Sequence, residues 1–303
     1  MGAVMSVETA PPTARWSRRK RLRYTGFRAV LRMRQWAARP TASRRSLPDF
    51  LIVGAQRCGT TSVYRYLTQH PSVLFPNLTK GTHWFDEEYQ RSEAWYRSNF
   101  PLDKVRHARE LETGGPVVVG EGCPYYMFHP AVPARIAQHL PEAKLIVVLR
   151  DPVARAWSQY NHEYRRCHES LSFEAALDAE EARLAGADEI LLSGPRRHFN
   201  HQHHSYVARG RYAEQLERLW THVDRDRCLV LYAADLERDP STVMQRVHAF
   251  LGVPVRETPS TGRWNAYDNK EIEPHLQARL SAAFEESDAW LAEHLEEPPP
   301  WRR

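Results

Sequence analysis

The chain has 303 residues and a formal net charge of +5 at pH 7, with 42 Lys or Arg against 37 Asp or Glu. This length suits one large domain with a substantial core. No apolar run approaches the roughly 20 residues of a membrane span, and the N-terminus lacks the apolar stretch of a secretory signal. The four cysteines are scattered and show no CxxC spacing, so they indicate neither a zinc site nor a disulfide framework, which fits a reducing cytoplasm.

The N-terminal segment, residues 1–46, holds 12 basic residues and one acid, Glu8, which gives it a charge of +11 and leaves −6 on the remainder. It can be a disordered solvated arm, a basic amphipathic helix on anionic lipid, or a polyanion-binding arm; we favour the first. We therefore predict a disordered or membrane-surface arm over 1–46 and one domain over 47–303. Arginine far outnumbers lysine, which indicates a bacterial genome rich in GC.

A buried strand followed by a glycine loop opens the predicted domain. Phe50 to Val53 form an apolar run that is typical of a parallel strand buried on both faces. Gly54 and Gly59 follow, and an amphipathic helix begins at Thr60. Backbone N–H groups and the positive end of such a helix bind phosphate, and Arg57 adds a charge inside the loop.

The two glycines have the spacing of the nucleoside-triphosphate loop G-x-x-x-x-G-K-[ST], but Thr60 stands where its lysine belongs. The lysine that reaches the β- and γ-phosphates is therefore missing. An ordinary turn with a capping threonine is the simpler alternative, but the strand, loop and helix together favour phosphate binding.

This segment, GAQRCGTTSVYRYLTQHP, resembles the 5′-phosphosulfate loop of sulfotransferases that use 3′-phosphoadenosine 5′-phosphosulfate (PAPS). The closest resemblance is to the carbohydrate type, which includes heparan sulfate 3-O- and N-sulfotransferases. The resemblance implies that the donor is bound by Arg57, Cys58, Gly59, Thr60, Thr61 and Ser62.

The segment from Lys80 to Pro101 resembles the family pattern K-E-x-H-F-F-D followed by a helix ending in W-Y. Lys80 matches the lysine that would neutralise the leaving oxygen. Gly81 replaces the usual catalytic glutamate, so another group must act as the base. We assign this role to His83, because a neutral imidazole with a reference pKa of about 6.5 suits a base near neutral pH. The alternative is that His83 only hydrogen-bonds a sulfonyl oxygen.

Val117 to Glu121 predict a second buried strand, which delivers Glu121 to its C-terminal end, where ligands bind in such sheets. The following residues resemble the family's E-K-T-P-S-Y, with Gly122 in place of the lysine. Glu121 is the second candidate for the base or for orienting His83, and Asp86 is the third. The resemblance places the acceptor against Trp84, Asp86 and Tyr125.

Lys144 to Leu149 predict a third buried strand, and the sequence RDPVARAWSQY follows it. It resembles the 3′-phosphate signature of the same family, and Pro152 suits a first helical turn. Arginine binds phosphate oxygens in pairs, so we expect Arg150 and Ser158 to bind the 3′-phosphate. That phosphate distinguishes PAPS from ATP.

Four histidines lie between residues 198 and 204 of the less regular segment 186–204, and we expect a solvated, substrate-facing loop there rather than a metal site, because no cysteine or carboxylate lies among the four. Tyr212, in a G-x-Y motif, is a further candidate for the nucleotide site. The family closes that site with a basic loop, for which Arg263 and Lys270 are the candidates here.

Strands and helices alternate, which predicts a three-layer α/β domain with a mostly parallel sheet, as in the P-loop NTPase-like sulfotransferases. We expect sulfuryl transfer from PAPS to a hydroxyl or amine of a carbohydrate, glycolipid or small-molecule acceptor, without a metal and without a nucleic-acid partner. Cytoplasmic localisation is expected, with peripheral contact to an anionic membrane as a further alternative. A P-loop kinase or NTPase is disfavoured by Thr60, whereas Gly81 and Gly122 leave room for a non-catalytic relative that binds nucleotide or polyanion.

Overall fold

A five-stranded parallel sheet forms the centre of the molecule in the computed structural model, which describes residues 18–77, 79–257 and 271–302. The strand order is β2-β3-β1-β4-β5, and every pairing is parallel. The strands are β1 (Phe50–Gly54), β2 (Val73–Leu74), β3 (Val118–Gly122), β4 (Lys144–Leu149) and β5 (Cys228–Tyr232). The predicted α/β class with a parallel sheet is confirmed.

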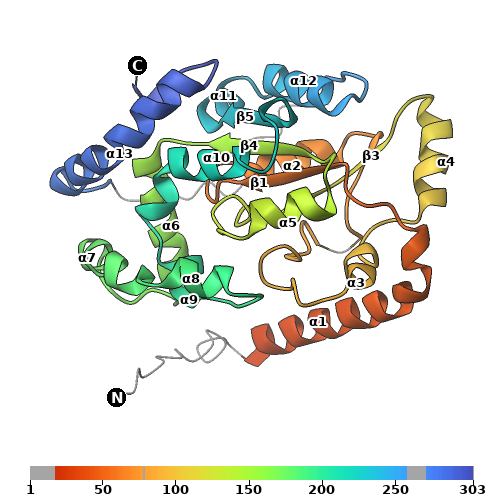
Figure 1. Cartoon of the computed structure of the whole chain (residues 1–303), viewed down its shortest axis with the longest axis horizontal. Coiled ribbons are helices and arrows are strands. Elements are labelled where there is room, and N and C mark those ends of the chain that lie inside the picture. The colour runs from red at the N-terminus through yellow and green to blue at the C-terminus, as the bar shows by residue number, and fades with distance from the viewer. Residues whose placement is uncertain (1–17, 78, 258–270, 303) are drawn as a thin grey trace.

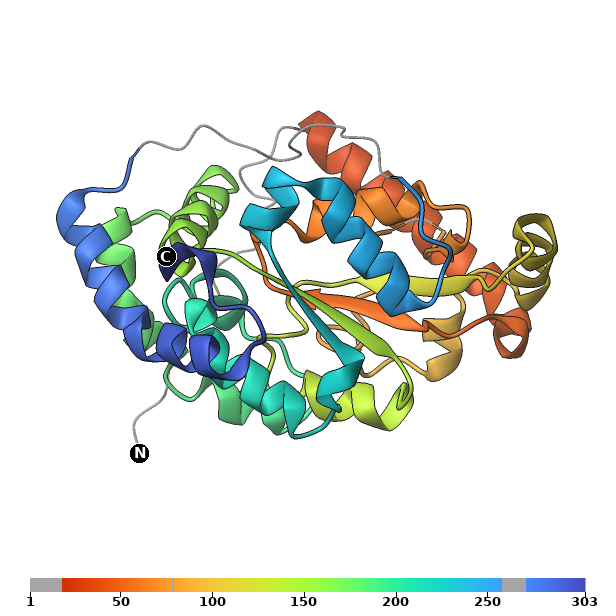
Figure 2. The same ribbon diagram turned by 90° about the horizontal axis from the view of Figure 1, so that it is seen from above.

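Helices cover both faces of this sheet (Figures 1 and 2). Helices α2 (Thr60–Thr68) and α12 (Pro240–Leu251) lie on one face, and α5 (Val132–His139) and α10 (Tyr212–Trp220) lie on the other. The chain moves from β1 towards one edge and from β3 towards the other, so right-handed crossovers place these helices on opposite faces. The point where the direction changes lies at the C-terminal end of β1, where such sheets bind ligands.

The central strands are apolar because both of their faces are covered. Every residue of β1 and β3 is buried, and in β4 only Lys144 is partly exposed. The sheet therefore forms the core of the domain. The remaining helices are α3 (Glu93–Arg97), α4 (Asp103–Thr113), α6 (Pro152–Arg165), α7 (Phe173–Leu184), α8 (Ala187–Leu192), α9 (Phe199–His203), α11 (Ala233–Arg238) and α13 (Pro274–His294).

The N-terminal segment is not a disordered arm where the structure describes it. Helix α1 (Arg18–Ala38) runs along the lower edge of the molecule in Figure 1 and continues into the 3-10 turn η2 (Arg39–Arg44). The buried Gln35 side chain donates a 2.8 Å hydrogen bond to Asn99, and Arg45 donates to the Phe100 carbonyl at 2.5 Å. The prediction of disorder is thus wrong for residues 18–46, because polar contacts attach them to the segment after α3.

None of the helices among the described residues has the length and apolar character required to cross a bilayer.

The histidine-rich segment also differs from its prediction. It forms α8 and α9 rather than a solvated loop, and His201 and His204 are buried. Each of the two rings is hydrogen-bonded, His201 to Tyr125 and His204 to Asn200. The segment therefore belongs to the structural framework of the domain.

Candidate active site

The loop between β1 and α2 lies at the C-terminal edge of the sheet and opens the site. Arg57 and Gly59 have positive φ angles of 70° and 92°, which turn the chain sharply before α2 begins at Thr60. Gly59 is the N-cap residue and has no side chain to satisfy the free N–H groups of the first turn. The loop thus presents backbone donors and the positive end of α2, as an anion site requires.

Arg57 and Ser158, two predicted donor-binding residues, meet although 101 positions separate them in the chain. Arg57 Nε donates to Ser158 Oγ at 3.0 Å, and Arg150 Nη1 lies 3.5 Å from the Arg57 carbonyl oxygen. Asp151 accepts a hydrogen bond from Val153 N and starts α6, which carries Ser158. The two motifs therefore converge where β1 and β4 end.

Cys58 belongs to this loop and contacts Tyr212 of α10, and both side chains are fully buried. The Tyr212 hydroxyl donates to the Arg150 carbonyl at 2.9 Å and lies 3.5 Å from Cys58 Sγ. These contacts tie α10 to both donor-binding loops. The structure thus gives Tyr212 a supporting position, whereas Arg263 and Lys270 lie outside the described residues.

Lys80 points at the start of α2. Its Nζ donates to Thr60 Oγ1 at 3.2 Å, and no carboxylate of the described residues pairs with it. Burial lowers the pKa of Lys80 to about 8. A desolvated cation without a carboxylate partner is well placed to receive an anionic ligand.

The two glycines that depart from the family pattern pack against each other's neighbours. A Cβ on Gly81 would overlap Cys123 Sγ and would lie 2.6 Å from the Gly122 carbonyl oxygen. A Cβ on Gly122 would lie 2.7 Å from Lys80 Cε. The aliphatic part of the Lys80 side chain therefore packs directly on Gly122. A side chain at either glycine would clash with the other glycine or with its neighbour in the sequence.

His83 lies beside two carboxylates in a tight turn, with a positive φ of 58°. Its Nδ1 is 3.0 Å from Asp86 Oδ2 and 3.8 Å from Glu87 Oε1, and its side chain is 43% exposed. Burial lowers the pKa of His83, but the carboxylates, Asp86 first, outweigh it and raise that pKa to about 9. The expected neutral imidazole is therefore an imidazolium at neutral pH.

Glu121 is fully enclosed beneath the same turn. Its carboxylate accepts hydrogen bonds from Thr82 N at 2.7 Å and from the hydroxyls of Tyr96 at 2.9 Å and Tyr126 at 3.2 Å. Burial raises the pKa of Glu121. These contacts anchor the backbone immediately before His83, which gives Glu121 a positioning geometry.

The two predicted aromatic contacts for the acceptor have different environments. Trp84 is only 2% exposed and stacks on Tyr96, with ring centroids 4.4 Å apart. Tyr125 lines a cavity, and its hydroxyl is hydrogen-bonded to His201 Nδ1 at 2.7 Å. Trp84 thus belongs to the core, and Tyr125 to the site.

This cavity has a volume of about 950 Å³ and joins the donor loop to the N-terminal helix. Gln56, His83 and Tyr125 line it on the side of the sheet. Trp95 and Arg209 also line it, and so do residues that were not expected at the site, among them Phe27, Leu31, Arg32, Trp36 and Arg39 from α1 and η2, and Arg166. They come from distant segments, and no sequence signal marks them as a group.

Arg209 connects the cavity to the donor loop. It is buried, donates to Gln56 Oε1 and to the carbonyl oxygens of His201 and Gln202, and its guanidinium lies 5.2 Å from the centre of the Tyr125 ring. It therefore fixes the boundary between the two halves of the site.

Comparisons with known proteins agree with this geometry. The family model for the sulfotransferase domain matches residues 47–271. Human bifunctional heparan sulfate N-deacetylase/N-sulfotransferase 3 is 32% identical over 225 residues, which cover 72% of this chain and 23% of that protein. Mouse heparan sulfate glucosamine 3-O-sulfotransferase 3A1 is 31% identical over 209 residues, which cover 69% of this chain and 47% of that protein.

The chain thus spans about a quarter to a half of the length of these curated relatives. Among solved structures, a sulfotransferase from Alicyclobacillus acidocaldarius is 32% identical, with a TM-score of 0.64, over 85% of this chain and 100% of that one.

Proposed function

The chain belongs to the sulfotransferase domain family, and we propose that it transfers the sulfuryl group of PAPS to a hydroxyl or amine of a carbohydrate-containing acceptor. The observation that carries this proposal is the 3.0 Å contact between Arg57 Nε and Ser158 Oγ. It brings a 5′-phosphate loop and a 3′-phosphate motif to one edge of the sheet. An ATP enzyme has no use for the second motif.

The donor-binding residues suit a ligand with two anionic ends. Arg57 and the first turn of α2 are assigned to the 5′-phosphosulfate, and Arg150 and Ser158, which adjoin Arg57, are assigned to the 3′-phosphate. Paired N–H donors of arginine bind phosphate oxygens strongly and directionally. PAPS would supply the activated sulfuryl group, and these residues would hold its phosphates.

Transfer forms a bond between the acceptor oxygen or nitrogen and sulfur and breaks the bond from sulfur to the 5′-phosphate oxygen. The protein must align the two partners, offset negative charge on the leaving oxygen, and accept one proton. Lys80, beside Thr60 at the start of α2, is placed to offset that charge. Sulfuryl transfer with these residues needs no metal ion.

We propose that His83 is the base that accepts the proton of the acceptor hydroxyl or amine, and that Asp86 orients its ring. Because Nδ1 is bonded to Asp86 Oδ2, Nε2 is the ring atom left for the acceptor. A base whose pKa is about 9 is strong but mostly protonated at neutral pH. The reaction should therefore accelerate as the pH rises towards 9.

The cavity supports an anionic saccharide or glycolipid as the acceptor. Its wall carries the arginines 32, 39, 91, 166, 197 and 209 against the glutamates 87, 88 and 163. Within the described residues, Arg32, Arg39 and Arg166 form no ion pair. Tyr125 and Trp95 offer ring faces on which a sugar can stack. The two relatives compared above are named for heparan sulfate.

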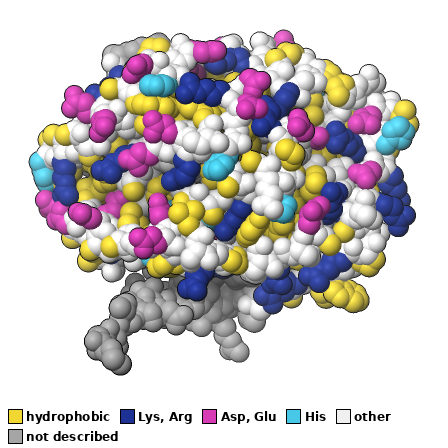
Figure 3. All heavy atoms as spheres, viewed as in Figure 1, with side chains coloured by type: hydrophobic (Ala, Val, Ile, Leu, Met, Phe, Trp, Pro, Cys, Tyr) yellow, Lys and Arg dark blue, Asp and Glu magenta, His cyan; other side chains and the backbone are white. Residues whose placement is uncertain are grey.

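We further propose a cytoplasmic enzyme that contacts anionic membrane through α1. This helix carries eight basic residues and no acid, and Phe27, Val30, Met33 and Trp36 expose apolar surface along it. Figure 3 shows basic and apolar side chains together on the lower edge of the molecule, where α1 lies. Each basic residue near an anionic surface contributes about 1 kcal/mol of attraction.

Vesicle flotation tests this membrane contact. Wild-type protein should float with phosphatidylglycerol-containing vesicles, and the Met33→Glu variant should bind at least several-fold less. Leu111→Glu is the matched control, because Leu111 is an equally exposed apolar residue on α4. Equal flotation of wild type and Met33→Glu would contradict the contact.

Two measurements test the sulfotransferase proposal. Calorimetry should show tighter binding of adenosine 3′,5′-bisphosphate than of ADP, and a preference for ADP would point to a kinase or NTPase. Labelled PAPS should then transfer its sulfuryl group to a member of a glycan and glycolipid panel. Bisphosphate binding without transfer to any acceptor would indicate a non-catalytic relative.

A further inference from the structure

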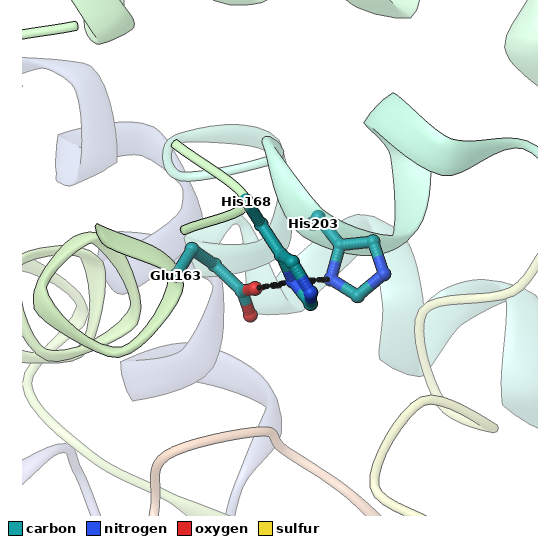
Figure 4. A group of neighbouring side chains, drawn as sticks. All are labelled: Glu163, His168 and His203. Atoms are coloured by element: carbon teal, nitrogen blue, oxygen red, sulfur yellow. Dashed lines mark hydrogen bonds and ion pairs between the residues drawn. The ribbon is translucent and has the colours of Figure 1, made fainter. Parts of the chain in front are cut away.

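Three side chains outside the donor site converge at one point on the cavity wall (Figure 4). Glu163 lies in the last turn of α6, His168 lies five residues further along the chain, and His203 ends α9. Glu163 Oε2 is 2.7 Å from His168 Nδ1 and 3.0 Å from His203 Nδ1, and the two nitrogens are 3.2 Å apart. Three potential ligand atoms therefore form a compact triangle.

We propose that Glu163, His168 and His203 bind a divalent transition-metal ion such as Zn²⁺. Two imidazoles and a carboxylate are a preferred donor set for such ions. Neighbouring ligands of an ion bound at about 2.1 Å lie roughly 3 to 3.5 Å apart, so small shifts of these side chains would admit one.

The surroundings of the two rings fit this role. The side chain of His168 is buried, and its Nε2 has no hydrogen-bond partner among the described residues. The polar contacts of the ring are therefore those of Nδ1, to Glu163 and His203. Glu163 Oε2 contacts the Nδ1 atoms of both rings, so an ion that replaced the protons between them would keep the same three partners.

An ion would reach this site through the cavity, which Glu163 and His203 line. Three protein ligands on a wall leave further coordination positions for water or for an anionic group in the cavity. A doubly charged ion beside one carboxylate leaves a net positive charge there. The ion would therefore add to the attraction of the cavity for an anion, separately from the transfer chemistry.

A second group, His83, Asp86 and Glu87, also brings ligand atoms together. It offers one imidazole and two carboxylates, and Glu87 is also paired with Arg197 at 3.3 Å. The first group offers two imidazoles, which Zn²⁺ and related ions prefer, so we assign the ion to the first group. The experiment separates the two.

The test uses the full chain without a histidine tag, stripped with a chelator. Titration with Co²⁺, followed by visible absorption, and with Zn²⁺, followed by calorimetry, should each saturate at one ion per chain. His203→Ala, whose side chain is partly exposed, should weaken binding at least tenfold, and Glu163→Gln should act likewise. His107→Ala is the matched control, because His107 lies on the surface 3.6 Å from Glu110.

Binding of adenosine 3′,5′-bisphosphate by each variant reports that its fold is intact. Unchanged Zn²⁺ affinity in a folded His203→Ala variant would overturn the assignment, as would the absence of saturable binding in wild type. Loss of binding in His83→Ala but not in His203→Ala would place the ion at the second group instead. None of these readouts depends on sulfuryl transfer, so the proposal can fail while the proposed function stands.

Discussion

The pH dependence of turnover is the most direct test of the role of His83. If its neutral ring accepts the acceptor's proton, only the deprotonated fraction is active. With a pKa of about 9, about one part in a hundred of the ring is neutral at pH 7. We therefore expect kcat at saturating PAPS, whose bound phosphate keeps Lys80 protonated, to rise nearly tenfold per pH unit below pH 8, by roughly 50-fold in all between pH 7 and 9, and then to level off.

The structure also predicts how this profile moves. Asp86→Asn removes the carboxylate that contributes most to holding the proton on His83, so the midpoint should fall by about 1–3 pH units. Glu88→Gln is the matched control, because Glu88 pairs with Arg91 and Arg197 instead. Its profile should superimpose on that of wild type.

Two results would refute this reasoning. A rate that is flat below pH 9 and falls above it would mean that the imidazolium stabilises charge and another group takes the proton. Retention of most activity in His83→Ala, combined with its loss in Glu121→Gln, would identify the buried carboxylate as the base. On the base assignment, His83→Ala should lower turnover by roughly 10²–10⁴ and leave bisphosphate binding nearly intact.

Three further outcomes follow from the site. Arg150→Ala should weaken binding of adenosine 3′,5′-bisphosphate by on the order of 1.5–3 kcal/mol in calorimetry, while a nucleotide without the 3′-phosphate is barely affected; equal losses would rule out its role. Bisphosphate affinity should decline as pH rises through about 8, where Lys80 loses its proton, and Lys80→Gln should abolish this dependence. Gly81→Glu, which introduces the glutamate of the family pattern, should not raise activity. It should lower the free energy of unfolding by about 1–3 kcal/mol or more, measured by thermal unfolding, because the new Cβ would overlap Cys123. Gly115→Ala is the control, because a Cβ there has space.

The donor half of the site could be predicted from sequence because its parts are local. Continuous apolar runs bounded by Gly, Pro or charged residues predicted the full extent of β4 and placed β1 to within one residue. The residues that we assign to the donor follow β1 and β4 directly, so knowing these strands places those residues on one edge of the sheet.

The acceptor half could not be predicted because its contacts are long-range. Helix α1 has no strong apolar stripe, and it is attached through the contact of Gln35 with Asn99, 64 positions away. The pKa of His83 is raised because the tight turn in which His83 has a positive φ brings the carboxylates of Asp86 and Glu87 to its imidazole ring. Such proximity is a property of the folded turn rather than of residue composition.

The position of α1 has a consequence for how this enzyme can diversify. The matched family domain covers residues 47–271 and holds the donor loop, Arg150 and His83, whereas the helix that closes the cavity precedes it. Part of the cavity wall is thus encoded outside the family domain, while Tyr125, Trp95 and Arg209 of that domain form other parts of it. A different helix grafted onto residue 46 would change the outer part of the wall and leave the loop after β1 in place, so the segment before the domain is one place to begin redesigning the cavity.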